Sequence, residues 1–571
     1  MINFTEIANF IWSVADLLRG NFKQSEYGKV ILPFTVLRRF DCVLAPSKKK
    51  ILEMNKNLTV TNKAPIFKRI TGHDYYNISR YDFEKLIDDS AAIETNLRDY
   101  INGFSDDIKE ILDNFEIGVV IERLKKANLL YLVVQKFAEL DLTMDSVDNL
   151  EMGYMYEELI RRFSELSNET AGEHFTPREV IELMVDLLFE PDMDEMTKDG
   201  KVVTVFDPAC GTGGMLSVAQ NKMREINNKI TVIPFGQELN PETYATCKSD
   251  MILKGNTNSK IQLGNSFNQD GFRGEHYDYL LSNPPFGVSW KKVEKYVKDE
   301  SQREGFNGRF GAGTPRISDG SLLFLQHMIS KMNDPKQSGS RIAIVFNGSP
   351  LFTGDAGSGE SEIRRWIIVN DMLEAIVALP DQLFYNTGIS TYIWIVTNRK
   401  TDRRKGKVRL VNGTQYFEKM RKSLGSKRNY LTDENRTDIV NLYSMYEAHE
   451  DYKDFDNEDF GYYKVTVERP EVYENGNIVT DKKGNNKADT SLRDTENIPL
   501  KDDVEESFKR EVLPHVPDAW IDESKTKIGY EIPFTKYFYK FTPLRSSEEI
   551  MIEIRELEER IATNLKEVFA E

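Results

Sequence analysis

The stretch VVTVFDPACGTGG, residues 202–214, gives the strongest indication of the fold. Its first five residues are β-branched or aromatic, a composition typical of a buried strand. The glycines that follow allow the backbone to turn tightly and to approach a ligand closely. Beyond them, apolar residues at Met215, Leu216, Val218 and Ala219 indicate a helix. The stretch therefore predicts a strand, a ligand-binding loop and a helix, which together begin a βαβ unit.

Short β-rich runs alternate with helical segments beyond this stretch, which predicts an α/β domain with a parallel sheet. Seven strands are expected, at residues 202–206, 232–236, 261–263, 277–282, 342–346, 374–379 and 391–396. The predicted architecture is a Rossmann-like, seven-stranded domain flanked by a helical N-terminal domain and a helical C-terminal region.

The tetrapeptide Asn283-Pro284-Pro285-Phe286 follows the fourth expected strand, at the sheet edge where open α/β folds bind ligands. Each proline removes a backbone N–H, so the carbonyl groups of this loop remain available as acceptors. An exocyclic amine held by the Asn283 side-chain oxygen and the Pro284 carbonyl would expose its nitrogen lone pair, while Phe286 stacks on the ring. The alternative is a plain Pro-Pro turn after a core strand.

The ends of three other strands provide candidate cofactor-binding residues. Glu238 follows the second strand and is placed to accept from ribose hydroxyls, and Asn265 and Ser266 follow the third, near an expected adenine edge. A dinucleotide loop has the pattern G-x-G-x-x-G, whereas this loop has G-T-G-G after an acidic residue that would repel a pyrophosphate. A cationic nucleoside without phosphate, such as S-adenosylmethionine, fits better. The candidates in the first loop are Asp207, Ala209, Cys210, Gly211, Thr212, Gly213 and Gly214.

Another candidate segment precedes the first strand. Thr176, Pro177 and Glu179 predict a helix start, with Thr176 as N-cap, Pro177 at the first helical position and Glu179 completing a capping box. His174 and Phe175 would then lie just before a helix N-terminus, where free N–H groups can meet a ligand. A single His in a loop is more often a surface or core residue, so this assignment depends on the neighbouring motifs.

Four regions follow from the patterns along the chain. Residues 1–148 have apolar residues at helical spacing and predict an interaction or clamp domain, and residues 149–425 form the predicted catalytic domain. The polar residues 426–500 indicate a linker with a possible hairpin. Residues 501–571 end in a predicted helix, with a capping box at Ser546 and Glu549 and an apolar stripe at heptad-like spacing. Such a stripe usually packs against a partner helix.

Two loops have more than one interpretation. Residues 287–320 contain many glycines together with Lys and Arg, and they form either a mobile solvated loop or a lid that grips the substrate. Residues 380–384, after the sixth expected strand, either line the substrate side or form a plain turn.

Composition limits the function classes. The formal net charge of −17 is unusual for a chain that holds nucleic acid alone, so a DNA substrate would require another component. The three cysteines have no zinc-site spacing, and no metal is expected. No apolar run approaches the ~20 residues of a membrane span, and no export signal is visible, so we expect a cytoplasmic protein.

The order of these motifs resembles that of the modification subunits of type I restriction-modification systems, which are adenine-N6 DNA methyltransferases with γ motif order. The resemblance depends on residues 174–178, 207–214, 237–238 and 283–286, and it extends over nearly the full length. It implies S-adenosylmethionine as cofactor and an adenine flipped out of the duplex. Asn265 departs from the family pattern, which frequently has an acid there. By resemblance, the cofactor-binding residues include Glu173, His174, Phe175, Thr176, Pro177, Arg178, Thr212, Gly213, Gly214 and Glu238.

The resemblance also implies partners. A separate specificity (S) subunit would read the sequence of double-stranded DNA, two modification subunits would clamp the duplex, and a restriction (R) subunit with motor and nuclease activity could join. The helix that ends region 501–571 would contact the specificity subunit. The chain itself has no GxxxxGK[ST] phosphate loop, so cleavage by this chain is not predicted.

Two alternative functions stay open from the sequence. One is methylation of another planar amine or amide, such as cytosine N4, an RNA base or a protein glutamine. The other is a non-catalytic assembly scaffold that retains the fold. Mass spectrometry of the methylated product would distinguish the first alternative from adenine methylation. Absence of S-adenosylmethionine binding would support the second alternative.

Overall fold

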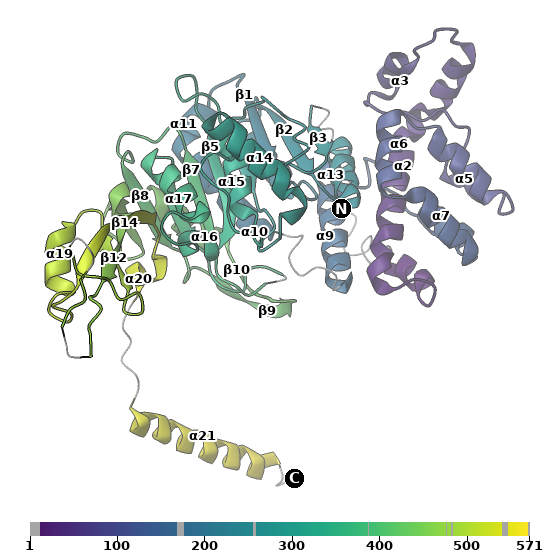
Figure 1. Cartoon of the computed structure of the whole chain (residues 1–571). Coiled ribbons are helices and arrows are strands. Elements are labelled where there is room, and N and C mark those ends of the chain that lie inside the picture. The colour runs from purple at the N-terminus through teal and green to yellow at the C-terminus, as the bar shows by residue number, and fades with distance from the viewer. Residues whose placement is uncertain are drawn as a thin grey trace. The chain divides into compact units, whose positions relative to one another are not determined.

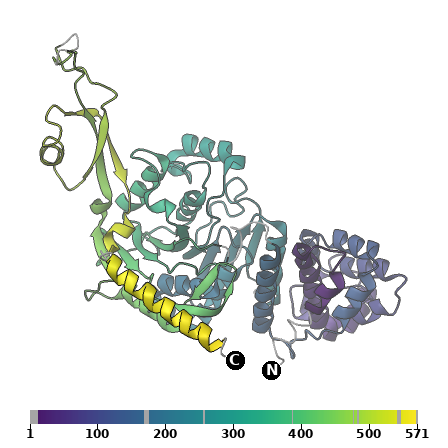
Figure 2. The same cartoon turned by 90° about the horizontal axis from the view of Figure 1, so that it is seen from below.

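The computed structural model describes residues 12–167, 176–254, 258–385, 387–474, 477–480, 484–539 and 546–568. The chain divides into two compact units, Met1–Ile532 and Pro533–Glu571. The first unit contains a helical N-terminal part, a large α/β sheet and a smaller C-terminal sheet (Figures 1 and 2). Among the described residues, no helix is both long enough and apolar enough to cross a membrane.

The N-terminal part is organised around the long helix α2, Tyr27–Asn57 (Figure 1). Arg39 of α2 is fully buried and donates to the carbonyl oxygens of Leu142 (2.7 Å) and Val147 (2.7 Å), so it holds the segment that leads into the next domain. The other helices are α3 (Ala64–Thr71), α4 (Phe83–Ile87), α5 (Ile93–Asn102), α6 (Asp106–Asn114), α7 (Ile117–Lys126), α8 (Leu130–Ala138) and α9 (Asn149–Ser167).

The central sheet has nine strands in the order β11-β8-β6-β7-β5-β4-β1-β2-β3. β7 is antiparallel to both β5 and β6, β11 is antiparallel to β8, and every other pair is parallel. The strands are β1 (Val202–Asp207), β2 (Thr231–Glu238), β3 (Lys260–Leu263), β4 (Tyr279–Ser282), β5 (Arg341–Asn347), β6 (Leu373–Ala378), β7 (Thr391–Thr397), β8 (Lys407–Asn412) and β11 (Tyr452–Asp456).

The expected α/β fold with a large, mostly parallel sheet is confirmed, and a strand is present at each of the seven expected positions. The strand count was too low, because β8 and β11 extend the sheet on one side. β11 is an edge strand with the sequence YKDFD, in which mainly exposed charged residues hide the apolar alternation that would have identified it. The seven mutually parallel strands, β1 to β6 and β8, all end at the same edge of the sheet.

Helices cover both faces of the sheet. Successive strand residues point to opposite faces, and Val205 of β1 belongs to the apolar core that also contains residues of α10 (Arg178–Phe189), α12 (Gly214–Ile226) and α18 (Asp433–Ser444). Its neighbour Phe206 contacts His327 of α15 (Ser321–Ile329), with ring centroids 6.1 Å apart. The remaining helices of the domain are α11 (Met193–Met196), α13 (Pro241–Leu253), α14 (Glu294–Glu304), α16 (Ser349–Phe352) and α17 (Gly359–Val369).

The predicted capping box at the start of α10 is wrong. The helix begins at Arg178, Pro177 is the N-cap residue, and no side chain caps it. Thr176 Oγ1 instead accepts a hydrogen bond from Asn283 Nδ2 (2.8 Å), and Glu179 forms an ion pair with Lys427. Partners that are distant in sequence have therefore taken the polar groups that local spacing assigned to a cap.

The interpretation of residues 426–500 as a linker is also wrong. This region contains β10 (Lys427–Tyr430), α18, β11 and β12 (Gly461–Glu468), and β12 pairs with β13 (Asp494–Pro499) and β14 (Trp520–Tyr530). Thr432 caps α18 through a capping box with Asn435, and Ile439 and Leu442 are buried. The polar residues near 475–485 that suggested a linker lie in the connection between β12 and β13, outside both strands. The other elements nearby are β9 (Glu418–Leu424) and α19 (Val504–Glu511).

The second unit contains α20 (Phe534–Phe538) and α21 (Ser547–Val568). The predicted capping box of α21 is confirmed: the N–H of Ser546 donates to Glu549, and the N–H of Glu549 donates to Ser546 Oγ, each at 3.1 Å. The apolar side chains Ile550, Ile554, Leu557 and Ile561 are all exposed. The predicted apolar stripe is thus not covered by the described residues of its own unit.

Candidate active site

The loop after β1 is organised around the buried side chain of Asp207. Asp207 Oδ1 accepts from the N–H of Ala209 (3.0 Å) and from Ser282 Oγ (2.9 Å), which joins the ends of β1 and β4. Gly213 has a φ of 86°, and a Cβ atom there would lie 2.7 Å from Cys247 Sγ on α13. Only glycine fits this position, which lets the loop pack closely against α13.

Glu238 ends β2 and lies against the same loop. Its Oε2 accepts from the N–H of Gly211 (2.9 Å), and its Oε1 accepts from the N–H of Asn240 (2.8 Å). The two hydrogen bonds fix the carboxylate between the first and second strand ends.

The loop after β3 is tied to the first loop by Ser266, whose Oγ donates to the carbonyl oxygen of Pro208 (2.5 Å). Asn265 Oδ1 accepts from the N–H of Phe267 (2.9 Å). The side-chain oxygen of Asn265 therefore stabilises its own turn, a role that an acid could also fill.

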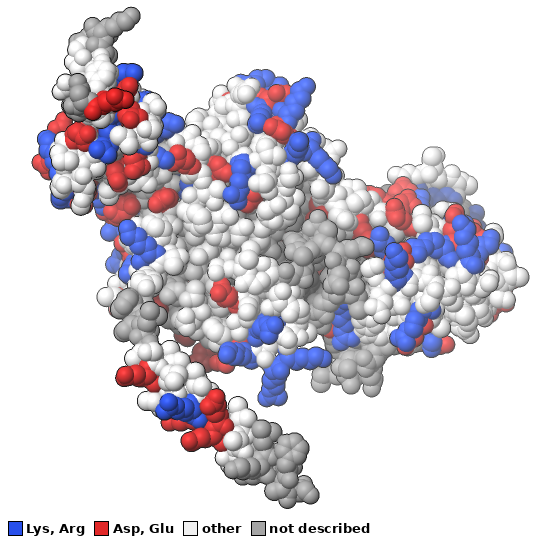
Figure 3. Space-filling view, turned by 60° about the horizontal axis from the view of Figure 1, so that its bottom comes forward, with Lys and Arg blue, Asp and Glu red and all other residues white. Residues whose placement is uncertain are grey.

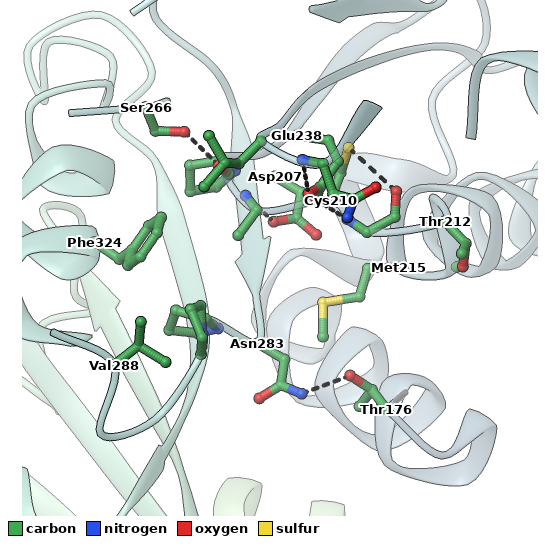
Figure 4. A pocket seen from close by; sticks show the side chains of 18 of the residues that line it. Thr176, Asp207, Cys210, Thr212, Met215, Glu238, Ser266, Asn283, Val288 and Phe324 are labelled. Atoms are coloured by element: carbon green, nitrogen blue, oxygen red, sulfur yellow. Dashed lines mark hydrogen bonds between the residues drawn. The ribbon is translucent and has the colours of Figure 1, made fainter. Parts of the chain in front are cut away.

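Asn283 follows β4, and its amide has a defined orientation. Nδ2 donates to Thr176 Oγ1, so Oδ1 is directed elsewhere (Figure 4). Oδ1 is buried and has no hydrogen-bond partner among the described residues. A buried carbonyl oxygen without a partner is unfavourable by about 1–3 kcal/mol, so such a group in a cavity indicates a ligand that donates to it.

These four strand ends surround a cavity of about 460 Å³ (Figure 4). Its volume is typical of a site for a small organic ligand. The sequence-identified residues that line it are Thr176, Arg178, Asp207, Ala209, Cys210, Gly211, Thr212, Gly214, Glu238, Asn265, Ser266, Asn283, Pro284, Pro285 and Phe286.

Some candidates do not line the cavity. Gly213 packs against α13 instead, and Pro177 serves as the N-cap of α10. Glu173, His174 and Phe175 lie outside the described residues.

Sequence reasoning missed several further lining residues. Met215 and Val218 lie on the helix after the first loop, and Asn240 and Pro241 follow β2 directly, so their positions alone could have identified them. Val288 and Phe324 come from the segment after the tetrapeptide, where no motif marks them. The full missed set is Ile181, Pro208, Met215, Val218, Leu239, Asn240, Pro241, Phe267, Val288 and Phe324.

The electrostatics of the cavity favour a cation. Burial raises the pKa of Asp207 from 3.8 to about 7, hydrogen bonds from Ala209 and Ser282 oppose that rise, and the charge of Glu238 adds to it. A ligand with positive charge would favour the ionised form of Asp207, whereas a phosphate would add a third negative group beside two carboxyls. The residues therefore fit a cationic nucleoside without phosphate.

Residues 287–320 form an ordered insertion, not a mobile loop. The insertion contains α14 and has its own apolar core, in which Trp290, Val297 and Phe310 are buried together with Phe267 of the cavity wall. It is therefore part of the structure that shapes the cavity.

Arg309 anchors this insertion. Its guanidinium donates to both carboxylate oxygens of Glu300 (2.9 and 2.6 Å) and to the carbonyl oxygens of Ser266 (2.8 Å) and Phe267 (2.5 Å). It also lies 3.2 Å from His327 Nδ1, and burial lowers the pKa of His327 to about 3, so this ring is neutral and Nδ1 accepts. The insertion and the loop after β3 are thereby joined through one side chain.

The fold and the cavity define the class: a Rossmann-like methyltransferase domain with a ligand site at the carboxyl ends of its parallel strands. The model of the N-6 DNA methylase family matches residues 147–490, and that of the HsdM N-terminal domain matches residues 7–137. This chain belongs to the N-6 DNA methylase family. The resemblance to modification subunits of type I restriction-modification systems is confirmed, and the chain is a DNA methyltransferase of that kind.

Individual relatives agree with this assignment. The type I restriction enzyme MjaIX methylase subunit of Methanocaldococcus jannaschii is 28% identical over 505 residues, covering 83% of each chain. The HindI methylase subunit of Haemophilus influenzae is 30% identical over 266 residues, covering 46% of this chain and 54% of that one.

Solved structures show the same fold. The type I restriction-modification methyltransferase subunit of Streptococcus thermophilus has a TM-score of 0.63 at 22% identity, covering 80% of this chain and 97% of that one. A chain from a structure of a type I R-M system has a TM-score of 0.52 at 20% identity, and the match covers 99% of this chain and 97% of that one.

Proposed function

We propose that this chain transfers the methyl group of S-adenosylmethionine to adenine N6 in a specific double-stranded DNA sequence, as the modification subunit of a type I complex that protects host DNA from cleavage. The observation that supports this most directly is the buried, unpartnered Oδ1 of Asn283, a residue that lines the cavity and is followed by two prolines and an aromatic ring. The Asn283 oxygen lacks a hydrogen-bond donor among the described residues, and the amino group of a bound base would supply one.

The tetrapeptide supplies acceptors and a stacking surface. Asn283 Oδ1 and the Pro284 carbonyl accept the two N6 hydrogens, and Phe286 stacks on the base. Holding both hydrogens would direct the nitrogen lone pair away from the ring. The nitrogen would then form a bond to the methyl carbon while the sulfur–methyl bond breaks with its electron pair left on sulfur, and one N6 proton would pass to water. Orientation and electrostatic stabilisation account for the acceleration, and no covalent enzyme intermediate is needed.

The strand-end loops fit the proposed cofactor. Asp207 and Glu238 would hold a cationic nucleoside, with Asp207 near its positive charge and Glu238 accepting from ribose hydroxyls. When bound, S-adenosylmethionine supplies a methyl group activated by its sulfonium. The proposed cofactor site is completed by the lining residues Thr176, Arg178, Ala209, Cys210, Gly211, Thr212, Gly214, Asn265 and Ser266. The resemblance adds Glu173, His174 and Phe175.

The partners follow from the same proposal. N6 is paired inside a duplex, so the adenine is flipped into the cavity, and a specificity subunit selects which adenine reaches it. A second modification subunit and a restriction subunit complete the proposed complex. The acidic net charge of this chain is compatible with DNA recognition by another subunit.

The first test separates the acceptor role of Asn283 from its shape. Asn283→Leu removes the acceptor with little change in volume, so methyl transfer to DNA should fall by at least about a hundredfold, because an acceptor aimed at the reacting group has an effect of that size. Asn283→Asp keeps an acceptor and should retain more activity than the Leu variant. Methyl transfer is measured on the chain assembled with its specificity subunit.

Cofactor affinity is the control for this test. Both variants should bind S-adenosylmethionine in calorimetry as the parent chain does, because Asn283 is assigned to the base. Equal methyl transfer by the Leu variant and the parent chain would reject the assignment. Mass spectrometry of digested DNA identifies the product, and N4-methylcytosine in place of N6-methyladenine would favour the alternative substrate class.

A further inference from the structure

The strands β9 and β10 form a small antiparallel sheet with concentrated positive charge. Residues 415–430 contain five Lys or Arg residues and one acid, Glu418, in a chain whose net charge is −17. Elsewhere, positive and negative side chains are interspersed over most of the face seen in Figure 3. We use the name hairpin cations for the exposed residues Lys419, Arg421, Lys422 and Arg428. None of them forms an ion pair with any residue in the described ranges.

β10 is the inner strand of this hairpin and is firmly attached. Its residues Lys427 and Asn429 are buried. The N–H groups of Arg428 (2.9 Å) and Asn429 (3.2 Å) donate to the carbonyl oxygen of Gln382, and the N–H of Ser426 donates to the carbonyl oxygen of Tyr385 (2.7 Å). β9 is the outer strand, and five of its seven residues are exposed. The hairpin cations are therefore presented on a fixed support.

That support lies at the cavity edge of the sheet. The loop 381–385 follows β6, the hairpin follows β8, and both strands end at the edge where β1 and β4 end (Figure 1). Lys427 Nζ pairs with the carboxylate of Glu179 and donates to the carbonyl oxygen of Leu383 (2.9 Å). Glu179 is the neighbour of Arg178, which lines the cavity.

We propose that the hairpin cations bind backbone phosphates of the DNA beside the flipped base. The proposal rests on the proposed function, because it needs a duplex at this cavity. Lys and Arg contacts to phosphate position a duplex without reading its sequence, and a nucleotide that leaves the stack requires its flanking backbone to be held. The hairpin would then position DNA at the cavity while the specificity subunit reads the sequence.

Two alternative roles of the hairpin predict different behaviour. Charged residues on an outer strand prevent pairing with another chain, and that role requires charge but not a positive sign. An acidic face of a partner subunit could also bind the hairpin, in which case assembly would depend on it. The DNA proposal requires positive charge and predicts salt-dependent binding.

The test replaces Lys419, Arg421 and Lys422 with Gln in the full chain, assembled with its specificity subunit. The matched control carries Lys198→Gln, Lys229→Gln and Lys405→Gln, three side chains exposed by 63%, 65% and 63%. These lysines precede β1, β2 and β8, at the opposite edge of the sheet. Fluorescence anisotropy measures affinity for a duplex that contains the recognition site over a range of salt concentrations.

The slope of log affinity against log salt should become shallower by about 0.9 for each phosphate that the variant no longer binds, and affinity at moderate salt should fall about tenfold or more relative to the control. Binding of S-adenosylmethionine should not change. The binding assay does not depend on methyl transfer. A failure of the proposed reaction would therefore be detected separately, by mass spectrometry of the digested DNA.

An unchanged slope in the hairpin variant overturns the proposal. Loss of assembly with an unchanged slope also overturns it and assigns the hairpin to a protein partner. The reversed variant Lys419→Glu with Lys422→Glu keeps the outer strand charged, and it should lose DNA affinity even more strongly. If the Glu variant binds DNA with the affinity of the parent chain, the phosphate contact is rejected and the hairpin keeps only its protective role. This outcome decides the question even if the Gln variant fails to fold.

Discussion

The orientation of the Asn283 amide depends on a single hydrogen bond to Thr176. An amide can rotate to exchange its oxygen and nitrogen, and the Thr176 hydroxyl accepts from Nδ2 in the arrangement observed. Residues 283 and 176 are more than a hundred positions apart, yet their contact decides which atom of the amide is left without a hydrogen-bond partner among the described residues. Asp207 is positioned in the same way, by Ser282 of the neighbouring strand.

Replacing Asp207 with Asn should change how stability depends on pH. The pKa of Asp207 is about 7 in the folded chain against 3.8 for the unperturbed group. The folded state therefore binds an additional proton between these values, and the stability that this group contributes is complete below about pH 4 and lost as the pH rises through about 7. Asp207→Asn has no such proton to lose. Its thermal midpoint, relative to the parent, should rise by a few degrees from about pH 5 to about pH 8 in calorimetry without cofactor.

Asp402→Asn is the control for that measurement. A hydrogen bond from Lys405 lowers the pKa of the exposed Asp402, so this group stays ionised through the same pH range. The difference between this control and the parent should not vary with pH. The same constant difference for Asp207→Asn would contradict a raised pKa at Asp207.

Among individual residues, sequence reasoning located the four strand-end motifs but not all of their partners. Asn283, Asp207 and Glu238 were identifiable because each lies at the end of a strand or directly after it. The capping role assigned to Thr176 was wrong, because its partner, Asn283, lies in the loop after β4 and is distant in sequence. Local spacing contains no information about such a contact.

The insertion 287–320 is the element whose role changes most between sequence and structure. It contributes Val288 to the cavity and shares an apolar core with Phe267. Its attachment depends on the Arg309–Glu300 pair, in which the side chains are only 11% and 8% exposed.

Arg309→Met should release the insertion from the cavity wall. Breaking a buried ion pair leaves an uncompensated charge, at a cost of about 3–5 kcal/mol. Cleavage by trypsin within 287–320 should become faster, and affinity for S-adenosylmethionine should fall about tenfold, since about 1.4 kcal/mol of lost support at Ser266 has that effect.

Arg303→Met is the matched control within the same insertion. Arg303 is 73% exposed and pairs with Glu304 at the surface, where such a pair contributes at most about 1 kcal/mol. This variant should keep the cleavage rate and cofactor affinity of the parent. Equal cleavage rates for both variants would show that Arg309 is not the anchor.

Element prediction succeeded where the apolar pattern was strong. Six of the seven expected strands are mostly buried, the exception being the edge strand β3, and the charged terminal helix was identified with its capping box. The missed strands β8 and β11 lie at one side of the sheet, and α18 packs against β8. In β11 and α18 the polar exposed residues outnumber the apolar ones, so composition indicated a linker there. β8 is mostly buried, but it lies in the region assigned to the catalytic domain and was not recognised as a strand.

For the chain in its complex, α21 is the clearest candidate for subunit contact. Leu557 and Ile561 are exposed by 52% and 57%. Leu557→Glu with Ile561→Glu should abolish co-purification with the specificity subunit, because an apolar seam cannot bury two charges. Cofactor affinity should be unchanged.

The control for this prediction lies on the polar side of the same helix. Glu556→Gln with Arg560→Gln keeps the apolar stripe and the net charge, so assembly should persist. If both double variants co-purify equally well, the stripe is not the contact.

The position of β7 between β5 and β6 has a consequence for biosynthesis. The chain makes β5 and β6 first, but neither has its shared partner until residues 391–397 have left the ribosome. Until then two apolar strands present open hydrogen-bonding edges, and open edges of this kind favour association with other chains. The nascent catalytic domain is therefore most exposed to misassembly during the synthesis of the short stretch that completes the centre of its sheet.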